Sequence, residues 1–270
     1  MSIASIVKQP PIDPLDARIL LSAALKLSRV QLITRSEHTL TADEARRLSA
    51  LFERRVNGEP IAYIVGEREF YGLAFHVTPA VLIPRPETEL LVELALERLP
   101  QNGRVLDMGT GSGAIAVALA HSRPDASVTA LDVSPAALAI ARQNATAHGA
   151  RVVFMQSDWY GALHEQRFDL ILSNPPYIVA GDRHLSQGDL RFEPVGALTD
   201  HADGLSALRT IIAGASRHLA PGGWLLMEHG FDQAAAVRRL LEAHAFCEMQ
   251  SWRDLAGIER ASGGATGRRN

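Results

Sequence analysis

Short apolar runs alternate with amphipathic stretches over most of the chain. Runs with the length of buried strands lie at 104–107, 127–132, 151–156, 168–173 and 223–228. Stretches with helical spacing of their apolar residues lie at 111–121, 135–148, 204–219 and 231–243. We predict a final pair of strands at 246–260. This alternation is typical of an α/β fold, in which helices cover both faces of a parallel sheet and ligands bind beyond the carboxyl ends of the strands.

The N-terminal part has a purely helical pattern. Two apolar stripes at helical spacing lie between residues 13 and 57. Thr41, followed three residues later by Glu44, is the capping-box signal for the start of the second helix. We therefore expect a small helical domain at 1–59.

Between Pro60 and Pro86 the pattern changes again. β-branched and aromatic residues are interrupted by turn residues, which predicts a hairpin. Pro86 stands at a first-turn position and opens a helix over 87–99. The division that we expect is thus a hairpin linker at 60–85 and an α/β domain at 86–270.

Composition narrows the class of protein. Of 270 residues, 47% are hydrophobic and 21% charged, the balance of a globular chain. The net charge of −3 gives no strong basic field, which disfavours stable nucleic-acid binding apart from a local basic patch. Cys247 is the only cysteine, so we expect neither a disulfide nor a metal site. No apolar run is long enough to span a membrane, and we expect a cytoplasmic protein.

A glycine-rich loop follows the first strand of the predicted sheet. Strand 104–107 runs into a loop with glycine at every second position, and a helix follows. Small residues there let a ligand approach the backbone and the helix N-terminus. Asp132 ends the next strand, 25 residues beyond Asp107, where a carboxylate can accept hydrogen bonds from ribose hydroxyls. Together these features indicate a nucleotide-like cofactor.

The loop alone does not identify that cofactor. Gly109, Gly111 and Ala114 also satisfy the dinucleotide fingerprint, so an NAD-dependent dehydrogenase is an alternative. S-Adenosylmethionine is favoured by the spacing of the glycines and by Asp107, a fixed negative group near a cationic ligand.

Asp158 and Trp159 follow the third strand. The Asp158 carboxylate is a candidate ligand of the adenine amino group, and Trp159 could pack against the ring. A helix N-cap followed by a core tryptophan would produce the same pair. Their position at the predicted ligand edge favours the cofactor role.

The acceptor tetrapeptide, Asn174-Pro175-Pro176-Tyr177, follows strand 168–173 and should lie beside the glycine loop. Its two prolines fix the backbone and remove N–H donors, so carbonyl oxygens face the site. The Asn174 side-chain oxygen and the Pro175 carbonyl could each accept an N–H bond from a planar amide or amine, while the Tyr177 ring covers it. This arrangement predicts methyl transfer to nitrogen without a metal or covalent intermediate.

Several segments resemble the PrmC/HemK family, the protein-(glutamine-N5) methyltransferases that modify peptide chain release factors. The matching segments are 58–64, 70–72, 81–89, 107–113, 174–177 and 254–257. Adenine-N6 DNA methyltransferases look similar at the acceptor tetrapeptide, so nucleic-acid methylation remains an alternative. The specific signals are the segment 83–89 and the helical N-terminal domain.

The resemblance implies a class I Rossmann-like methyltransferase domain with a mostly parallel seven-stranded sheet. It also implies that the helical domain helps to dock a release factor, whose Gly-Gly-Gln glutamine is methylated to support translation termination. The residues assigned to S-adenosylmethionine by the resemblance are Gly109, Thr110, Gly111, Ser112, Gly113, Asp132, Trp159 and Asn174. The acceptor tetrapeptide receives the glutamine, with Asn174, Pro175 and Tyr177 as the catalytic residues. Arg85 and Glu87 have no assigned role.

Overall fold

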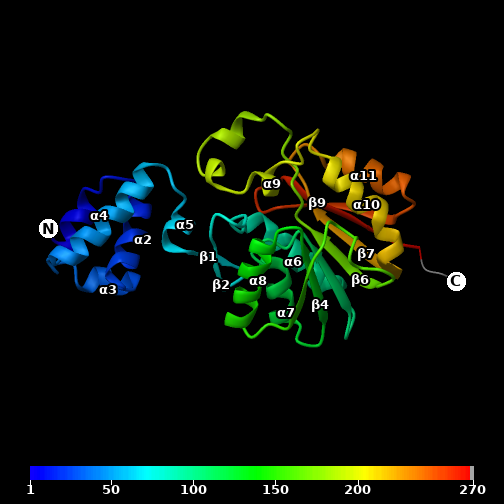
Figure 1. Ribbon diagram of the computed structural model, residues 1–270, viewed down its shortest axis with the longest axis horizontal. Coiled ribbons are helices and arrows are strands. Elements are labelled where there is room, and N and C mark those ends of the chain that lie inside the picture. Colours follow the sequence, from blue (N-terminus) through cyan, green and yellow to red (C-terminus); the bar gives the residue numbers. More distant parts are fainter. Residues whose placement is uncertain (268–270) are drawn as a thin grey trace. The chain divides into compact units, whose positions relative to one another are not determined.

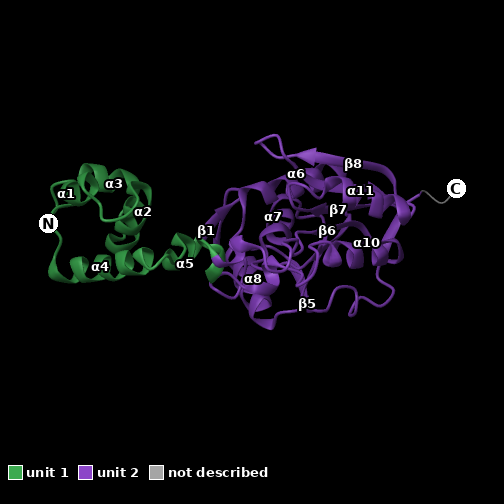
Figure 2. Ribbon diagram, turned by 90° about the horizontal axis from the view of Figure 1, so that it is seen from above, with its two compact units in different colours: residues 1–67, 187–192 green, residues 68–186, 193–270 purple. Residues whose placement is uncertain are grey.

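The computed structural model describes residues 1–267 and divides into two compact units (Figure 2). Unit 1 consists of residues 1–67 together with 187–192. Unit 2 consists of residues 68–186 and the chain from 193 onward.

Unit 1 is helical, as predicted. Its helices are α1 (Ile3–Lys8), α2 (Pro14–Leu25), α3 (Arg29–Thr34), α4 (Ala42–Val56) and α5 (Ile61–Val65). The predicted capping box is confirmed, because the Glu44 backbone N–H donates to Thr41 Oγ1 at 3.2 Å and the Thr41 N–H donates to Glu44 Oε2 at 2.8 Å. The buried core of this unit contains Ile3, Ile6, Leu20, Leu21, Ala24, Leu32, Leu48 and Ile64.

The prediction for residues 61–65 is wrong, because they form α5 rather than the first part of the hairpin. Pro60 precedes the helix and Gly66, in the left-handed region at φ 78°, ends it. Three of its five residues are buried, so the segment has no polar face. Its sequence therefore lacks the alternation of polar and apolar residues that predicts an amphipathic helix. The short helices α1 and α3 were also not predicted, since six residues are too few to produce a clear period.

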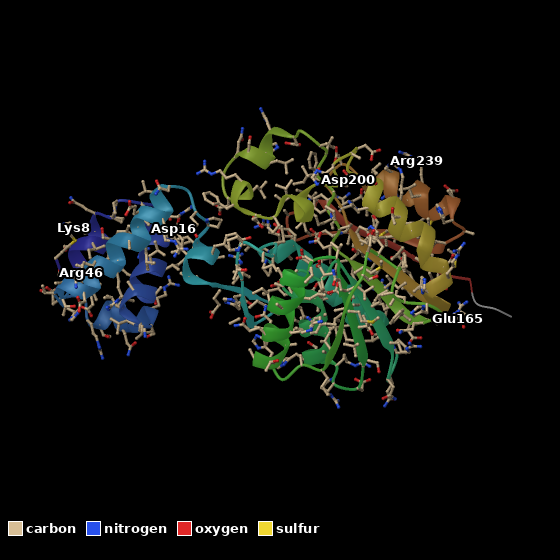
Figure 3. All side chains as sticks on the ribbon, in the orientation of Figure 1. Lys8, Asp16, Arg46, Glu165, Asp200 and Arg239 are labelled. Atoms are coloured by element: carbon tan, nitrogen blue, oxygen red, sulfur yellow. The ribbon has the colours of Figure 1, made fainter. Side chains whose placement is uncertain are left out.

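A short segment from later in the chain belongs to unit 1. Arg55 donates to Asp189 at 3.3 Å, and also to Asp16 of α2 (labelled in Figure 3) at 2.6 Å. Arg191 donates to the backbone carbonyl of Asn57 at 3.0 Å. The chain beyond the acceptor tetrapeptide is therefore tied to the end of α4 at residues 187–192.

The predicted hairpin is confirmed over a shorter range. Its strands are β1 (Glu67–Phe70) and β2 (Leu73–His76). Gly72 lies at φ 74° in the turn between them, a conformation that favours glycine. A short 3-10 helix, η1 (Pro86–Thr88), follows and continues into α6 (Glu89–Arg98), as the proline at residue 86 predicted.

The mostly parallel seven-stranded sheet is confirmed. Its strands are β3 (Arg104–Met108), β4 (Ser127–Asp132), β5 (Val152–Gln156), β6 (Phe168–Ser173), β7 (Leu219–Glu228), β8 (Cys247–Arg253) and β9 (Glu259–Ala265). Their order is β5-β4-β3-β6-β7-β9-β8, with β3 to β7 parallel and β9 antiparallel to both neighbours. The strand order therefore reverses between β3 and β6, where an open α/β sheet binds its ligand.

Helices cover both faces of the sheet (Figure 1). They are α7 (Ala114–Ser122) and α8 (Pro135–Ala147) with α6 on one face, and α10 (Ser206–His218) and α11 (Ala234–Ala243) on the other. Neighbouring strand residues point to opposite faces, so Leu226 joins the core beneath α6 and α7 while Leu225 joins the core beneath α10 and α11. Short helices η2 (Arg183–Ser186), η3 (Leu190–Phe192) and α9 (Val195–Leu198) lie in the long connection after β6.

The last strand differs from the prediction. The pair expected at 246–260 is real, but β9 extends to Ala265 and lies between β7 and β8. A Cβ added at Gly263 would lie 2.2 Å from the backbone oxygen of Leu225, so only glycine fits there. The run of small residues has no β-branched signal, which is why the sequence pattern did not indicate a strand. Residues 268–270 of the tail lie outside the described range.

Candidate active site

The sheet brings the predicted site segments to one edge. Met108, the last residue of β3, pairs with Leu131 on one side and Ser173 on the other. The Ser173 hydroxyl also donates to the Met108 carbonyl at 2.7 Å. The glycine loop, Asp132 and Asn174 therefore emerge side by side, because each lies at or directly beyond a paired strand end.

These segments line a cavity of about 360 Å³. Its predicted lining residues are Gly109, Gly111, Asp132, Asp158, Trp159, Asn174 and Pro176. It is also lined by residues to which the sequence analysis assigned no role in the site, namely Ala80, Val81, Leu82, Met108, Leu131, Val133, Ser134, Ala137, Ser157, Pro194, Gly196 and Ala197. Five predicted residues are not part of the lining, namely Thr110, Ser112, Gly113, Pro175 and Tyr177.

Glycine is required in the loop by the backbone and by the space in front of it. Gly109 and Gly111 have φ values of 72° and 55°, which disfavour other residues. A Cβ at either position would meet nothing within 4 Å, so the loop is open on the cavity side. Gly113 differs, because its Cβ would lie 3.1 Å from the Cβ of Ala141 on α8. Gly113 thus allows helix packing, while Gly109 and Gly111 leave room for a ligand.

Thr110 and Ser112 hold the loop from behind. Both are buried, and the Thr110 hydroxyl donates to Asp107 Oδ2 at 2.6 Å. The Ser112 carbonyl accepts a hydrogen bond from Asn144 Nδ2 at 2.8 Å. Their predicted contact with the cofactor stays a prediction, and neither side chain faces the cavity.

Asp107 differs from our expectation of a fixed charge beside the cofactor. It is only 1% exposed and does not line the cavity. Burial raises the pKa of Asp107 to about 7, against the hydrogen bond from Thr110, and the nearby Asp132 carboxylate raises it further. Asp107 therefore supports the loop from within the core. Its carboxyl group is largely protonated below pH 7.

Asp132 is positioned for hydroxyl recognition. Its Oδ2 accepts from the Gly111 backbone N–H and its Oδ1 from the Ser134 N–H, both at 2.9 Å. Two amides thus fix the carboxylate at the cavity wall, and each oxygen keeps a further acceptor position. These free acceptor positions, with the open glycine loop beside them, fit the hydroxyl groups of the ribose in an adenosine-containing cofactor.

Asp158 and Trp159 also reach the cavity. Asp158 is exposed, while Trp159 packs partly against the core beneath α10 and α11. Trp159 has φ 45°, and its carbonyl accepts from the Ser157 hydroxyl at 2.7 Å. The tryptophan therefore packs against the core and also lines the cavity, so it is available to stack on an adenine ring.

Asn174 belongs to a buried hydrogen-bond network. Its Nδ2 donates to Thr88 Oγ1 at 3.1 Å, and the Thr88 hydroxyl donates to Glu228 Oε2 at 2.6 Å. The Tyr177 hydroxyl donates to the other oxygen, Glu228 Oε1, at 3.1 Å. Asn174 Oδ1 and the Pro175 carbonyl accept no hydrogen bond from any residue that the structure describes. Asn174 lines the cavity, so its oxygen is available to a substrate N–H group, whereas Pro175 is buried and lies outside the lining.

Thr88 and Glu228 were missed by sequence reasoning. Thr88 lies inside the segment 83–89 that carries the resemblance, and Glu228 ends a predicted strand at the ligand edge. Burial raises the pKa of Glu228 to about 7, against hydrogen bonds from Thr88 and Tyr177. Burial likewise raises the pKa of Tyr177, and the Glu228 charge adds to that effect. Position at a strand end was the one signal that could have identified Glu228.

Arg85 has a structural partner. It forms an ion pair with Glu193, whose side chain is fully buried. Glu193 also accepts from the Ile83 backbone N–H at 3.0 Å. The segment before η1 is thereby tied to the connection that follows the acceptor tetrapeptide, and two walls of the cavity are held together.

Comparison with known proteins agrees with this geometry. Residues 86–188 match the methyltransferase small domain, and residues 5–66 match the PrmC N-terminal domain. A release factor glutamine methyltransferase of Burkholderia pseudomallei is 57% identical over 270 residues, covering 97% of this chain and 95% of that protein. A release factor glutamine methyltransferase of Salmonella typhimurium is 49% identical, covering 92% of this chain and 91% of that protein. A solved methyltransferase of Pyrococcus furiosus shares the fold, with a TM-score of 0.57 at 20% identity over 81% of this chain and 99% of that one.

The mostly parallel sheet, the match to the methyltransferase small domain and the relatives identify an S-adenosylmethionine-dependent methyltransferase. Within this class, the chain belongs to the release factor glutamine methyltransferase family.

The raised pKa of Asp107 predicts a pH-dependent stability contribution. Because the folded-state pKa lies above the unfolded value, this contribution is fully present below about pH 4 and is lost as the pH rises through about 7. An asparagine side chain cannot ionise, so the stability of wild type relative to Asp107→Asn should fall between about pH 5 and about pH 8. Urea unfolding of both proteins at the two pH values measures this difference. An equal difference at both would show that Asp107 is already ionised at the lower pH.

Asp132→Asn is expected to weaken S-adenosylmethionine binding by roughly 10–100-fold, because it removes a charged acceptor and turns an N–H group toward a backbone donor. The matched control is Asp169→Asn, since Asp169 also accepts a backbone N–H, from Arg104 at 2.7 Å, at the opposite edge of the sheet. Isothermal titration calorimetry measures the affinity of both variants for S-adenosylmethionine. Wild-type affinity in Asp132→Asn would exclude the proposed ribose contact.

Proposed function

We propose that this protein transfers the methyl group of S-adenosylmethionine to the side-chain amide nitrogen (N5) of the glutamine in the Gly-Gly-Gln motif of peptide chain release factors, supporting translation termination. The observation that carries the proposal is the free oxygen of Asn174, which is available for an N–H group while the amide nitrogen is bound to Thr88. The identity of the relatives across nearly the whole chain supports the same substrate.

The residues that would hold the donor are Gly109, Gly111, Asp132, Asp158 and Trp159. When bound, S-adenosylmethionine supplies a methyl group on a positively charged sulfur. Thr110, Ser112 and Gly113 would contribute through the shape of the loop, since none of them lines the cavity. Asn174 lines the same cavity and so would stand between donor and acceptor.

An amide nitrogen is a weak nucleophile because its lone pair is delocalised into the carbonyl. Asn174 Oδ1 and the Pro175 carbonyl would each accept one N–H bond, which makes the nitrogen more electron-rich and directs its lone pair toward the methyl group. Orientation of reactants in this way can lower a barrier by roughly 7–11 kcal/mol. No side chain has to deprotonate the amide before transfer, because the nitrogen becomes strongly acidic once it carries the methyl group and then releases one proton to solvent.

Tyr177 would cover the planar acceptor. Its hydroxyl donates to Glu228, and its backbone carbonyl accepts from Gln233 Nε2 at 3.0 Å. The residue is therefore held at both ends, which fixes the axis of its ring. Pro176 lines the cavity and completes the acceptor wall.

The alternatives are less well supported. In the dinucleotide-binding fold the strand order is 3-2-1-4-5-6, whereas here the last strand, β9, is antiparallel and is inserted between β7 and β8. A net charge of −3 gives no general attraction to nucleic acid. We also propose that unit 1 helps to dock the release factor, because residues 5–66 match the PrmC N-terminal domain.

Within residues 1–267, none of the helices has the length and apolar character that a membrane-spanning segment requires. The location that we propose is the cytoplasm, where peptide chain release factors act.

The proposal predicts that labelled S-adenosylmethionine transfers its methyl group to a purified release factor, at the glutamine of its Gly-Gly-Gln loop. Nucleic acid, incubated in parallel, should stay unlabelled. A release factor with that glutamine replaced by alanine is the matched control. Label in DNA or RNA but never in the release factor would replace this proposal with the nucleic-acid alternative.

Asn174→Ala should lower turnover by roughly 10²–10³-fold, the effect of losing one pre-organised polar group at a reacting centre. Donor affinity should fall much less, because Asp132 and the glycine loop remain. Single-turnover methyl transfer and calorimetric titration with S-adenosylmethionine measure the two quantities. Turnover close to that of wild type would remove Asn174 from the proposed role.

A further inference from the structure

We propose that Thr88 and Glu228 are positioning residues that hold the Asn174 amide in the one orientation that turns its oxygen toward the acceptor nitrogen. This inference rests on the proposed function, and it extends the reaction machinery to two residues outside the acceptor tetrapeptide. Its structural basis is the chain of hydrogen bonds from Asn174 Nδ2 through the Thr88 hydroxyl to Glu228.

The direction of this chain follows from chemistry. A hydroxyl has one proton, and Thr88 donates its proton to Glu228 Oε2 at 2.6 Å. The Thr88 oxygen can then only accept, so its other partner must be a donor. Asn174 meets that requirement with Nδ2 but not with Oδ1, at the observed 3.1 Å. The amide oxygen is consequently directed away from Thr88.

Glu228 is the acceptor that sets this direction. A second donor, the Tyr177 hydroxyl, reaches its other oxygen at 3.1 Å, so both carboxylate oxygens accept. Among the charged groups facing it, Arg260 favours the ionised form and Glu87 opposes it. Burial raises the pKa of Glu228 to about 7, so the group is an ionised carboxylate above that pH, where it can accept hydrogen bonds but cannot donate them. Above about pH 7, Glu228 therefore holds Thr88 in the donating orientation.

The fold places these groups next to each other. Ser173 of β6 pairs with Met227 of β7, so Asn174 and Glu228 follow directly from paired positions. Thr88 ends η1, immediately before α6. Thr88 and Glu228 are 5% and 2% exposed, so water has little access to replace a lost partner.

The orientation matters because a flipped amide would fail. Nδ2 would then face the N–H groups of the acceptor amide, and two donors would oppose each other. The acceptor nitrogen would lose a hydrogen bond that increases its electron density, and its lone pair would no longer be directed toward the methyl group. Asn174 alone has no preference between the two orientations, since its oxygen and nitrogen are nearly the same size. The buried network supplies that preference.

Thr88→Val and Thr88→Ser test the hydroxyl. Valine keeps the shape but removes the hydrogen bonds, whereas serine keeps them. We expect Thr88→Val to lower kcat on a release factor by roughly 10–100-fold, with the Kd for S-adenosylmethionine changed by less than about twofold. Thr88→Ser should retain most of the wild-type kcat. Wild-type kcat in Thr88→Val, or an equal loss in both variants, would overturn the proposal.

Glu228→Gln and the double variant test whether the two residues act in series. If they do, Glu228→Gln alone lowers kcat, and adding Thr88→Val to it causes little further loss. Independent packing defects would instead multiply, and a double variant at the product of the two single effects would overturn the proposal.

A readout without any acceptor separates this inference from the proposed function. In protein labelled with ¹⁵N, the Asn174 side-chain amide protons should exchange slowly with solvent in wild type and faster in Thr88→Val. Equal exchange rates would reject the positioning role even if the release factor is methylated. Slower exchange in wild type, with no methylation of the release factor, would reject the substrate and keep the positioning role.

Discussion

The site depends on the parallel pairing of β3 with β4 and β6. Met108 pairs with both Leu131 and Ser173, so the glycine loop, Asp132 and the acceptor tetrapeptide all begin at one edge of the sheet. Segments that are distant in the chain thereby line one cavity. A shift of one residue in either pairing would turn the strand's buried side chains to the other face. The buried cores on both faces therefore hold donor and acceptor positions in register.

Buried polar groups provide the finer alignment behind that edge. Asp107 holds the glycine loop through Thr110, Glu193 ties Ile83 to the later connection, and Glu228 joins Tyr177 to Thr88. Burial of a carboxyl group is unfavourable, as the raised pKa values of Asp107 and Glu228 show. Each of these carboxyl groups accepts hydrogen bonds from specific donors, which is typical of buried side chains that orient a reacting site.

The parts of the molecule with a repeating pattern could be predicted from the sequence. The apolar runs predicted β4 and β6 to the residue, and the glycine loop and acceptor tetrapeptide fell at strand ends as expected. Features without a period could not be predicted: α5 is buried on most sides, and β9 consists largely of small residues. The contacts of Glu228 with Thr88 and of Glu193 with Ile83 join residues 140 and 110 positions apart, so no local pattern indicates them.

The proposed reaction depends on Asn174 presenting its oxygen, and not its nitrogen, to a glutamine amide. The most direct measurement is a crystal structure of the protein with S-adenosylhomocysteine and a peptide containing Gly-Gly-Gln. We expect the glutamine side-chain nitrogen within about 2.7–3.2 Å of Asn174 Oδ1, with Nδ2 still bonded to Thr88. A glutamine nitrogen outside hydrogen-bond distance of Asn174, or an Asn174 amide no longer bonded to Thr88, would contradict this expectation.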